Sequence, residues 1–386
     1  MKTRTSTADT FDLGSILRPG DGVLWGQACA EPQTLVAALV AQPMDVQVFL
    51  GSSYSGIVKP GALRLSSYCA TGTNRALADA GALEILPVPY SQLGPLIRER
   101  RIRCDVVFVQ VSPPNARGEH SLGLAADYLV PALDTCRAIV AEVNAQVPWT
   151  YTERTLTAAD FDLCIESDRP PAMPPARAAG ELELAIARNA LPFIPDGAVL
   201  EFGIGTLPDA VCALLGRHEG LRVHSGTVGD GVVELAERNV VSRIDAAMLI
   251  GSTRLFEFAR ENERVRLRSS EYTHDAEVLA RQPRFVAINS AVEVDFTGQV
   301  NGELAGASYV GAVGGALDFV RAANRSPGGV SLTLIPASRV VEKLSGPVSI
   351  PRSEAGVIVT EKGAADLRGC GLREREQRMR SISGKS

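Results

Sequence analysis

Short apolar runs alternate with amphipathic segments along most of the chain. The amphipathic stretches at residues 90–101 and 178–191 predict helices. Val-rich runs predict strands, and they lie at residues 45–51, 104–112, 138–146 and 284–295. Apolar strands that alternate with helices are typical of parallel sheets covered on both faces. The pattern therefore predicts the α/β class.

One pattern occurs twice, in residues 19–40 and again in residues 194–215. Each segment has Asp-Gly, a short apolar strand, a glycine-bearing turn, a proline and then an apolar-periodic helix. Repetition on this scale predicts two similar domains rather than a solenoid. The proline-rich stretch from Asp168 to Glu181 is the predicted linker. We place the boundary near Ala178, which gives domains 1–178 and 179–386.

The second repeat contains the turn Gly203–Gly205 and the sequence Thr-Leu-Pro-Asp after it. Thr206 is predicted to be the N-cap of the helix, and Asp209, three residues on, to complete a capping box. A glycine turn that leads into a helix N-terminus gathers unpaired N–H groups. Such a turn can hold a phosphate or an oxyanion, or it can serve only for tight packing of strand against helix.

The composition excludes several classes of protein. Of the 386 residues 45% are hydrophobic and 22% charged, and the formal charge of -5 argues against general binding of nucleic acid or an anionic membrane. Seven dispersed cysteines predict reduced thiols in a cytoplasm, and four scattered histidines indicate no metal site. Residues 1–15 lack the apolar core of a signal peptide, and no apolar run is long enough to cross a bilayer.

Several stretches resemble the acetyl-CoA hydrolase/transferase family, in the family's order and over nearly the whole chain. They are Gln110–Gly123, Ile139–Pro148, Leu200–Val211, Val228–Leu235, Ile288–Asn301, Gly311–Ala323 and Val359–Arg375. The resemblance implies two open α/β domains of the CoA-transferase type with a site in the cleft between them. It also implies an acyl-CoA substrate, with coenzyme A as part of that substrate and no permanently bound cofactor, and a homodimer. Residues 65–75 are the candidates for selecting the acyl group.

The resemblance also implies residues that contact CoA. The glycine-rich turn with Gly311, Gly314 and Gly315 lies against CoA in the family, and its N–H groups could face the thioester oxygen. Gln299 and Asn301 resemble positions near the active site, although such amides could equally satisfy buried backbone. With the turn at Gly203 and Gly205, these residues form the predicted CoA-binding set.

The family's nucleophile is a glutamate that follows a His-Thr pair and precedes an Asp-Gly pair. In this chain the corresponding residues are His224, Ser225 and Gly226, followed by Asp230 and Gly231. Glycine has no side chain, so the glutamyl-CoA intermediate of the family cannot form at position 226. The sequence therefore favours direct attack by water, with His224 as the general base or as a hydrogen-bonding support. Ser225 is a weaker candidate nucleophile.

Two alternatives stay open. A relocated carboxylate could keep the transferase reaction, and Glu201 is the first candidate, ahead of Glu303 and Asp230. The chain could also be a catalytically inactive CoA-binding subunit. His274 and Asp275 are interpreted as a turn and a cap before a helix.

Overall fold

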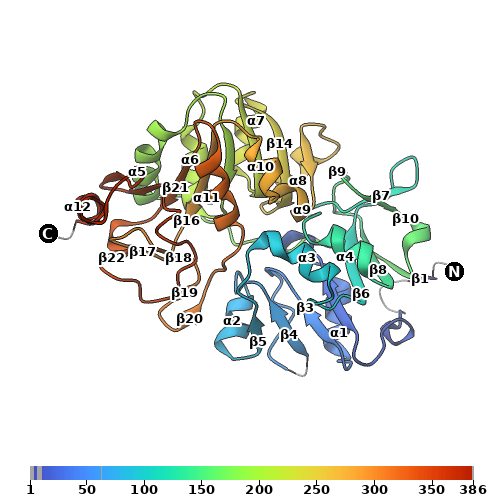
Figure 1. Cartoon of the computed structure of the whole chain (residues 1–386). Coiled ribbons are helices and arrows are strands. Elements are labelled where there is room, and N and C mark those ends of the chain that lie inside the picture. Colours follow the sequence, from blue (N-terminus) through green and yellow to red (C-terminus); the bar gives the residue numbers. More distant parts are fainter. Residues whose placement is uncertain (1–3, 7–10, 62, 385–386) are drawn as a thin grey trace. The chain divides into compact units, whose positions relative to one another are not determined.

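The computed structural model describes residues 4–6, 11–61 and 63–384, so residues 1–3 and 7–10 of the stretch examined for a signal peptide lie outside the described residues. The chain forms two compact units and contains two large, mainly parallel sheets (Figure 1). Unit 1 comprises Met1–Pro174 and Ala247–Tyr272, and unit 2 comprises Pro175–Ala246 and Thr273–Ser386. The chain first changes unit inside the predicted proline-rich linker, close to Ala178. It then returns to unit 1 for residues 247–272, whereas the sequence predicted one division and no return.

Unit 1 is built on an eight-stranded sheet in the order β1-β11-β8-β6-β2-β3-β4-β5, and every neighbouring pair is parallel. Its strands are β1 Arg4–Ser6, β2 Gly22–Trp25, β3 Gln47–Phe49, β4 Arg64–Ser67, β5 Leu83–Ile85, β6 Val106–Val111, β8 Ala138–Asn144 and β11 Leu163–Ser167. Its helices are α1 Gln33–Ala41, α2 Asn74–Asp79, α3 Leu93–Arg98, α4 Leu129–Thr135 and α8 Thr253–Ala259. The residues of this unit also include an antiparallel pair, β7 Glu119–Ser121 with β10 Thr155–Thr157, and the parallel strands β9 Tyr151–Thr152 and β15 Val265–Leu267, which belong to the second sheet. All six residues of β6 are buried, as expected for a strand covered on both faces.

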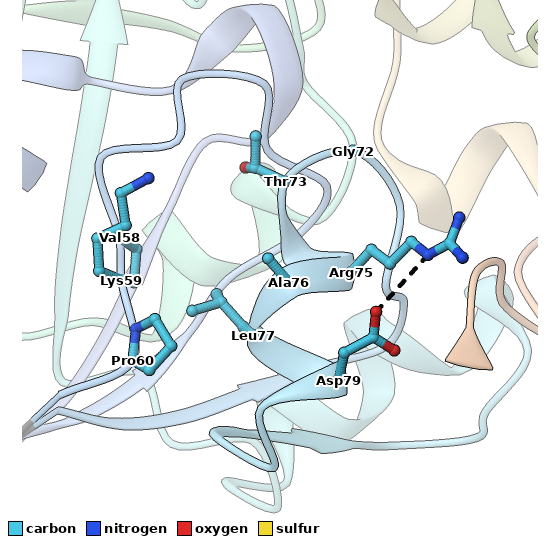
Figure 2. Close-up of a pocket in the computed structure, with 9 residues that line it drawn as sticks. All are labelled: Val58, Lys59, Pro60, Gly72, Thr73, Arg75, Ala76, Leu77 and Asp79. Atoms are coloured by element: carbon cyan, nitrogen blue, oxygen red, sulfur yellow. Dashed lines mark ion pairs between the residues drawn. The ribbon is translucent and has the colours of Figure 1, made fainter. Parts of the chain in front are cut away.

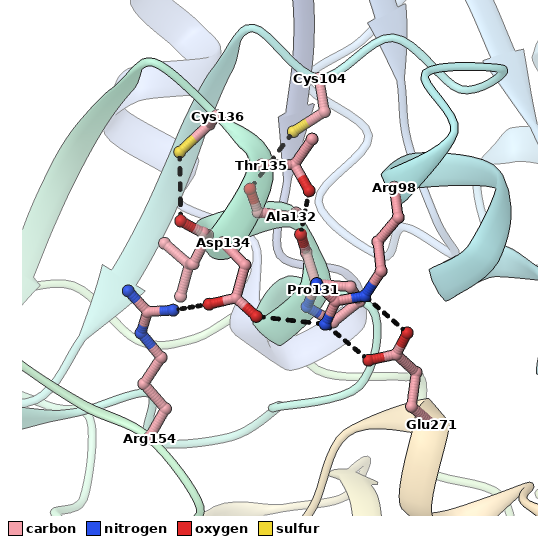
Figure 3. Close-up of polar contacts among 10 residues, drawn as sticks. Arg98, Cys104, Pro131, Ala132, Asp134, Thr135, Cys136, Arg154 and Glu271 are labelled. Carbon is pink, nitrogen blue, oxygen red and sulfur yellow. Dashed lines mark hydrogen bonds and ion pairs between the residues drawn. The ribbon is translucent and has the colours of Figure 1, made fainter.

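Polar contacts hold the returning segment within unit 1. The N–H of Leu249 donates to the carbonyl of Leu124 at 2.8 Å. Arg98 of α3 donates to both carboxylate oxygens of Glu271 at 2.8 Å, and its other contact is Asp134, which also pairs with Arg154 (Figure 3). The two carboxylates raise the pKa of the Arg98 guanidinium further. Because these partners are distant in the sequence, apolar periodicity gave no sign of the return.

Unit 2 contains most of the second sheet, which has nine strands in the order β24-β23-β21-β16-β12-β13-β14-β15-β9, with β24 antiparallel to β23. The strands of this unit are β12 Val199–Phe202, β13 Leu221–Val228, β14 Val241–Leu249, β16 Phe285–Ser290, β21 Val330–Leu334, β23 Val357–Thr360 and β24 Gly363–Asp366. The helices are α5 Glu181–Ala190, α6 Thr206–Leu214, α7 Gly231–Glu237, α10 Ala276–Ala280, α11 Ala316–Arg325 and α12 Leu372–Ser383, and α9 Ser270–Thr273 spans the change of unit. Short strands β17 Glu293–Asp295, β18 Val300–Asn301, β19 Leu304–Ala305, β20 Ser308–Tyr309 and β22 Val340–Val341 form two further small sheets.

Helices α10 and α11 cover one face of the second sheet around β12 and β16. Val199, Phe285 and Ala287 of the strands form one buried cluster with Leu279 of α10 and with α11, which contributes Phe319, Ala322 and Ala323. Side chains alternate between the two faces of a strand, so the other residues on this face of β12 and β13 point toward the same two helices. The candidate chemistry of unit 2 lies on this face.

Candidate active site

The turn after β12 is open, and it leads directly into α6. Gly205 has a φ of 121°, which a residue with a side chain rarely adopts, and a Cβ on Gly203 would meet nothing closer than 3.8 Å. Ile204 between them is 37% exposed. The predicted cap is wrong, because Gly205 is the N-cap, Thr206 is already helical and no side chain caps α6. The N–H of Gly203 donates to the carbonyl of Ile288 at 3.0 Å, so the open part of the turn is at Ile204 and Gly205, which are exposed and are not required by tight packing.

Glu201 lies on β12, two residues before this turn, and it is only 2% exposed. The amide of Asn289, on the neighbouring strand β16, donates to its Oε2 at 2.8 Å. Burial raises the pKa of the Glu201 carboxyl to about 8, although the Asn289 hydrogen bond and the Ile288 backbone lower it. At neutral pH this group therefore holds its proton, and it would have to lose that proton to act as a nucleophile.

His224, Ser225 and Gly226 lie on β13, next to β12. Ser225 donates through Oγ to the carbonyls of Phe202 and Thr227, and the N–H of Phe202 donates to it at 3.2 Å. These contacts hold Ser225 against the backbone of β12 and of its own strand. Nε2 of His224 lies 3.0 Å from the carbonyl oxygen of Thr273. Because a carbonyl can only accept, Nε2 of His224 carries a proton and donates it to Thr273.

Gly226 lies against the imidazole of His274, which the sequence had assigned only to a turn. A Cβ on residue 226 would lie 3.0 Å from Nε2 of His274 and 3.1 Å from its Cε1, closer than side chains normally pack. The His274 ring centre also lies 4.6 Å from the ring centre of Phe319 on α11. Its neighbour Asp275 is the N-cap of α10, as predicted, because its carboxylate accepts from the N–H groups of Glu277 and Val278. The interpretation of His274 as a turn residue therefore misses its main contact.

Thr273 connects the two buried imidazoles. Its carbonyl accepts from His224, and its hydroxyl lies 2.9 Å from Nδ1 of His274. Burial, with a smaller contribution from the nearby His224, lowers the pKa of His274 to about 3. His274 is therefore neutral at neutral pH. Nothing in the local sequence, a polar run before a short helix, indicated that these residues meet β13.

The glycine-rich loop before α11 approaches the same histidine. A Cβ on Gly315 would lie 2.5 Å from Nε2 of His274, so only glycine fits there. Gly314 has a φ of 57°, and Gly311 lies so close to the carbonyl of Gly302 that a Cβ would be 2.0 Å away. Gly311 is thus explained by packing, while Gly314 and Gly315 shape a partly exposed loop beside His274.

The predicted amides Gln299 and Asn301 hold local structure. Gln299 donates through its side chain to Asp295 at 2.7 Å, and Asn301 donates to the carbonyl of Leu304 at 2.7 Å. Both carboxylate oxygens of Glu303 accept hydroxyl protons, one from Ser349 and one from Tyr309. These contacts agree with the alternative in which Gln299 and Asn301 satisfy buried polar groups. Both carboxylate oxygens of Glu303 are already hydrogen-bonded within the fold.

A separate cavity lies in unit 1. It has a volume of about 370 Å³ and lies between residues 58–60 and the start of α2, where Arg75 pairs with Asp79 at 3.7 Å (Figure 2). Gly72, Thr73 and Arg75, which belong to the segment predicted to select the acyl group, contribute to its lining. Within the described residues, no cluster of side chains suits a metal ion and no helix has the length and apolarity to span a membrane.

Comparison with known proteins identifies the family. A model of the acetyl-CoA hydrolase/transferase C-terminal domain matches residues 251–384. The chain is 32% identical to 4-hydroxybutyrate coenzyme A transferase of Clostridium kluyveri over 389 residues, which cover 94% of this chain and 90% of that protein. The chain belongs to the acetyl-CoA hydrolase/transferase family.

A solved structure and a second curated protein also resemble this chain. The crystal structure of RipA from Yersinia pestis superposes with a TM-score of 0.91 at 27% identity, covering 98% of this chain and 94% of that one. The chain is also 26% identical to acetyl-CoA hydrolase of Saccharomyces cerevisiae over 242 residues, 55% of this chain and 44% of that protein. The predicted α/β fold of the CoA-transferase type is confirmed.

Proposed function

We propose that this chain hydrolyses an acyl-CoA by direct attack of water on the thioester, without a glutamyl-CoA intermediate. The observation that carries the proposal is Gly226 packed against His274. Where the resemblance leads us to expect the attacking glutamate, the backbone has no side chain and an imidazole occupies the adjoining space. A family member built in this way has no carboxylate at position 226 to receive the acyl group.

The remaining groups suit hydrolysis. N–H groups of Ile204 and Gly205 in the open turn, and of Gly314 and Gly315 in the loop before α11, can donate to the oxygen that becomes negative in the tetrahedral intermediate. Removing one such donor from a hydrolase typically lowers kcat by about 100-fold or more. Coenzyme A then leaves as the thiol, and the acyl group leaves as a carboxylic acid.

Transfer to a carboxylate acceptor is the second candidate, and Glu201 would be its nucleophile. The 4-hydroxybutyrate coenzyme A transferase relative favours this candidate, and Glu201 lies on β12, beside the strand that carries Gly226. Against it, burial keeps the Glu201 carboxyl protonated at neutral pH. An ionised carboxylate is needed for attack, and for that reason we place hydrolysis ahead of transfer in this proposal.

The experiment follows free thiol during incubation with acetyl-CoA, with and without added 4-hydroxybutyrate or succinate. Hydrolysis predicts thiol release in water alone, at a rate that the acceptor does not increase. Transfer predicts a new thioester only when acceptor is present, and borohydride would then leave a reduced glutamate in the protein. An inactive subunit would bind CoA and give neither product.

Two further predictions belong to this proposal. The dispersed cysteines favour a cytoplasmic enzyme. The resemblance favours a homodimer, which sedimentation of the purified protein would detect as twice the chain mass.

A further inference from the structure

The cavity in unit 1 has no part in the proposed hydrolysis, although it has room for a ligand. Its volume of about 370 Å³ lies within the range of roughly 300 to 1,000 Å³ that is usual for small-molecule sites. Figure 2 shows residues 58–60 on one side of the cavity and residues of α2 on the other. The chemistry of these two sides indicates which class of ligand the cavity suits.

Much of the cavity wall is apolar. Val58 and Leu77 line it and are only 6% and 2% exposed, and the methyl group of Ala76 lies beside them. Such a wall packs against an alkyl chain and offers no hydrogen bond to a ligand. Thr73 adds no donor, because its N–H and its hydroxyl both donate to the carbonyl of Ser53, at 2.8 and 3.1 Å. A ligand of this cavity is therefore apolar over most of its length.

One positive charge of the cavity lining has no counter-charge. Arg75 pairs with Asp79 at 3.7 Å, whereas none of the carboxylates in the described part of the chain forms an ion pair with Lys59. A Cβ on Gly56 would lie 3.7 Å from Nζ of Lys59 and 3.6 Å from Cγ2 of Thr73, so the ammonium group lies at the Thr73 end of the cavity. The lining thus combines an unpaired cation with an apolar wall.

We propose that this cavity binds a short-chain carboxylate, whose anionic group pairs with Lys59 and whose alkyl chain packs against Val58 and Leu77. A single ammonium group is a point charge, and it suits a monoanion. A phosphate would need several donors, such as backbone N–H groups or a bidentate arginine, and the donors of Thr73 are already used. The site contains none of the residues assigned above to the thioester reaction, so the inference goes beyond the proposed hydrolysis and does not depend on it.

Calorimetric titration of the full-length protein with sodium butyrate, in the absence of any CoA compound, tests the inference. Wild type should bind butyrate saturably, and it should bind 1-butanol, which has no charge, far more weakly. Lys59→Gln should raise the Kd of butyrate by about tenfold or more, because a hydrogen bond between charged groups contributes a factor of that size. The matched control is Lys343→Gln, which removes an exposed lysine of unit 2 and should leave the Kd unchanged.

Filling the cavity distinguishes this site from any other place that takes up butyrate. Ala76→Phe keeps every charge and adds a ring at an exposed position of α2, so it should weaken butyrate binding as well. Butyrate binding that is unchanged in Lys59→Gln and in Ala76→Phe would overturn the inference, as would the absence of binding to wild type. Tighter binding of inorganic phosphate than of butyrate would overturn the assignment to a carboxylate. None of these results affects the proposed hydrolysis, which thiol release from acetyl-CoA tests separately.

Discussion

The two units contain the same strand–turn–helix sequence pattern and use it differently. In unit 1 the turn between β2 and α1 is buried, and a Cβ on Gly26 would lie 2.6 Å from the carbonyl oxygen of Ala30. In unit 2 the turn between β12 and α6 is open, and a Cβ on Gly203 would meet nothing closer than 3.8 Å. The first turn is therefore a packing device, while the second keeps its backbone accessible. A glycine-bearing turn in the sequence does not by itself show whether the glycine serves tight packing or an open backbone. The residues that surround the turn in the fold decide this.

The polar side chains around the two turns differ in the same way. In unit 1, Gln27 donates to Tyr90 and Asp127 at 2.6 and 2.7 Å and accepts from Tyr68 and Ser52 at 2.8 and 3.0 Å. Every polar atom of this side chain is thus paired, as expected of a structural network. In unit 2 the polar groups are two buried imidazoles and a carboxyl whose pKa burial raises, which are groups that can exchange protons. The repeat in unit 1 therefore contributes to stability, and the repeat in unit 2 lies beside the candidate catalytic groups.

Breaking the unit 1 network should give the largest change in stability. Gln27→Ala leaves the buried Asp127 carboxyl and two hydroxyls without this partner, so the free energy of unfolding should fall by about 3 kcal/mol or more. Urea unfolding followed by circular dichroism measures it. Gln33→Ala is the control, because Gln33 makes one hydrogen bond, to the carbonyl of Pro170, and its loss should be about 1 kcal/mol. A loss below that value for Gln27→Ala would contradict a structural role for the turn.

The Gly226–His274 contact should appear as an energetic coupling. Gly226→Glu places a side chain within 3.0 Å of the His274 ring, so the free energy of unfolding should fall by roughly 2 kcal/mol or more. His274→Ala removes the ring, and the double variant should lose less than the sum of the two single losses, with a coupling of about 1 to 3 kcal/mol. If the loss of unfolding free energy in the double variant equalled the sum of the two single losses, residues 226 and 274 would not compete for the same space.

The matched glycines test the comparison directly. Gly26→Ala should lower the free energy of unfolding by about 1 to 3 kcal/mol, because its Cβ would overlap the carbonyl of Ala30. Gly203→Ala should change it by less than about 1 kcal/mol, since ordinary contacts surround the new atom. Its effect should instead be seen in KM or kcat of thiol release. Equal losses of stability in the two variants would contradict the difference between the turns.

The smallest expected effect is the pH dependence from Glu201. Its pKa is about 8 in the folded protein and 4.5 in the reference state, so between these values the folded chain holds a proton that the unfolded chain has released. Stability from this group therefore falls as pH rises through that window, by at most ~1.4 kcal/mol per pH unit. Glu201→Gln does not titrate, so it should gain about 1 kcal/mol relative to wild type between pH 6 and pH 7. If urea unfolding gave the same difference in free energy of unfolding between Glu201→Gln and wild type at pH 6 and at pH 7, the raised pKa of Glu201 would be contradicted.

Local periodicity predicted the elements, and long-range contacts explain what it missed. The apolar runs at 104–112 and 138–146 became β6 and β8 because fully apolar segments of that length form strands covered on both faces. The cap at Thr206 was wrong because Gly205 can adopt the positive φ that ends the turn. His274 was missed because its partner Gly226 belongs to another element, and a glycine gives no sign in the sequence of what occupies the space beside it.

Turnover of acetyl-CoA in water labelled with oxygen-18 tests direct hydrolysis most directly. After many turnovers, mass spectrometry is used to examine both the released acetate and the peptides of the enzyme. Attack by water on the thioester predicts label in the acetate and none in any aspartate or glutamate of the protein. Label in a peptide that contains Glu201, or in any other carboxylate side chain, would show that an enzyme-bound acyl or CoA ester had formed and would contradict the account.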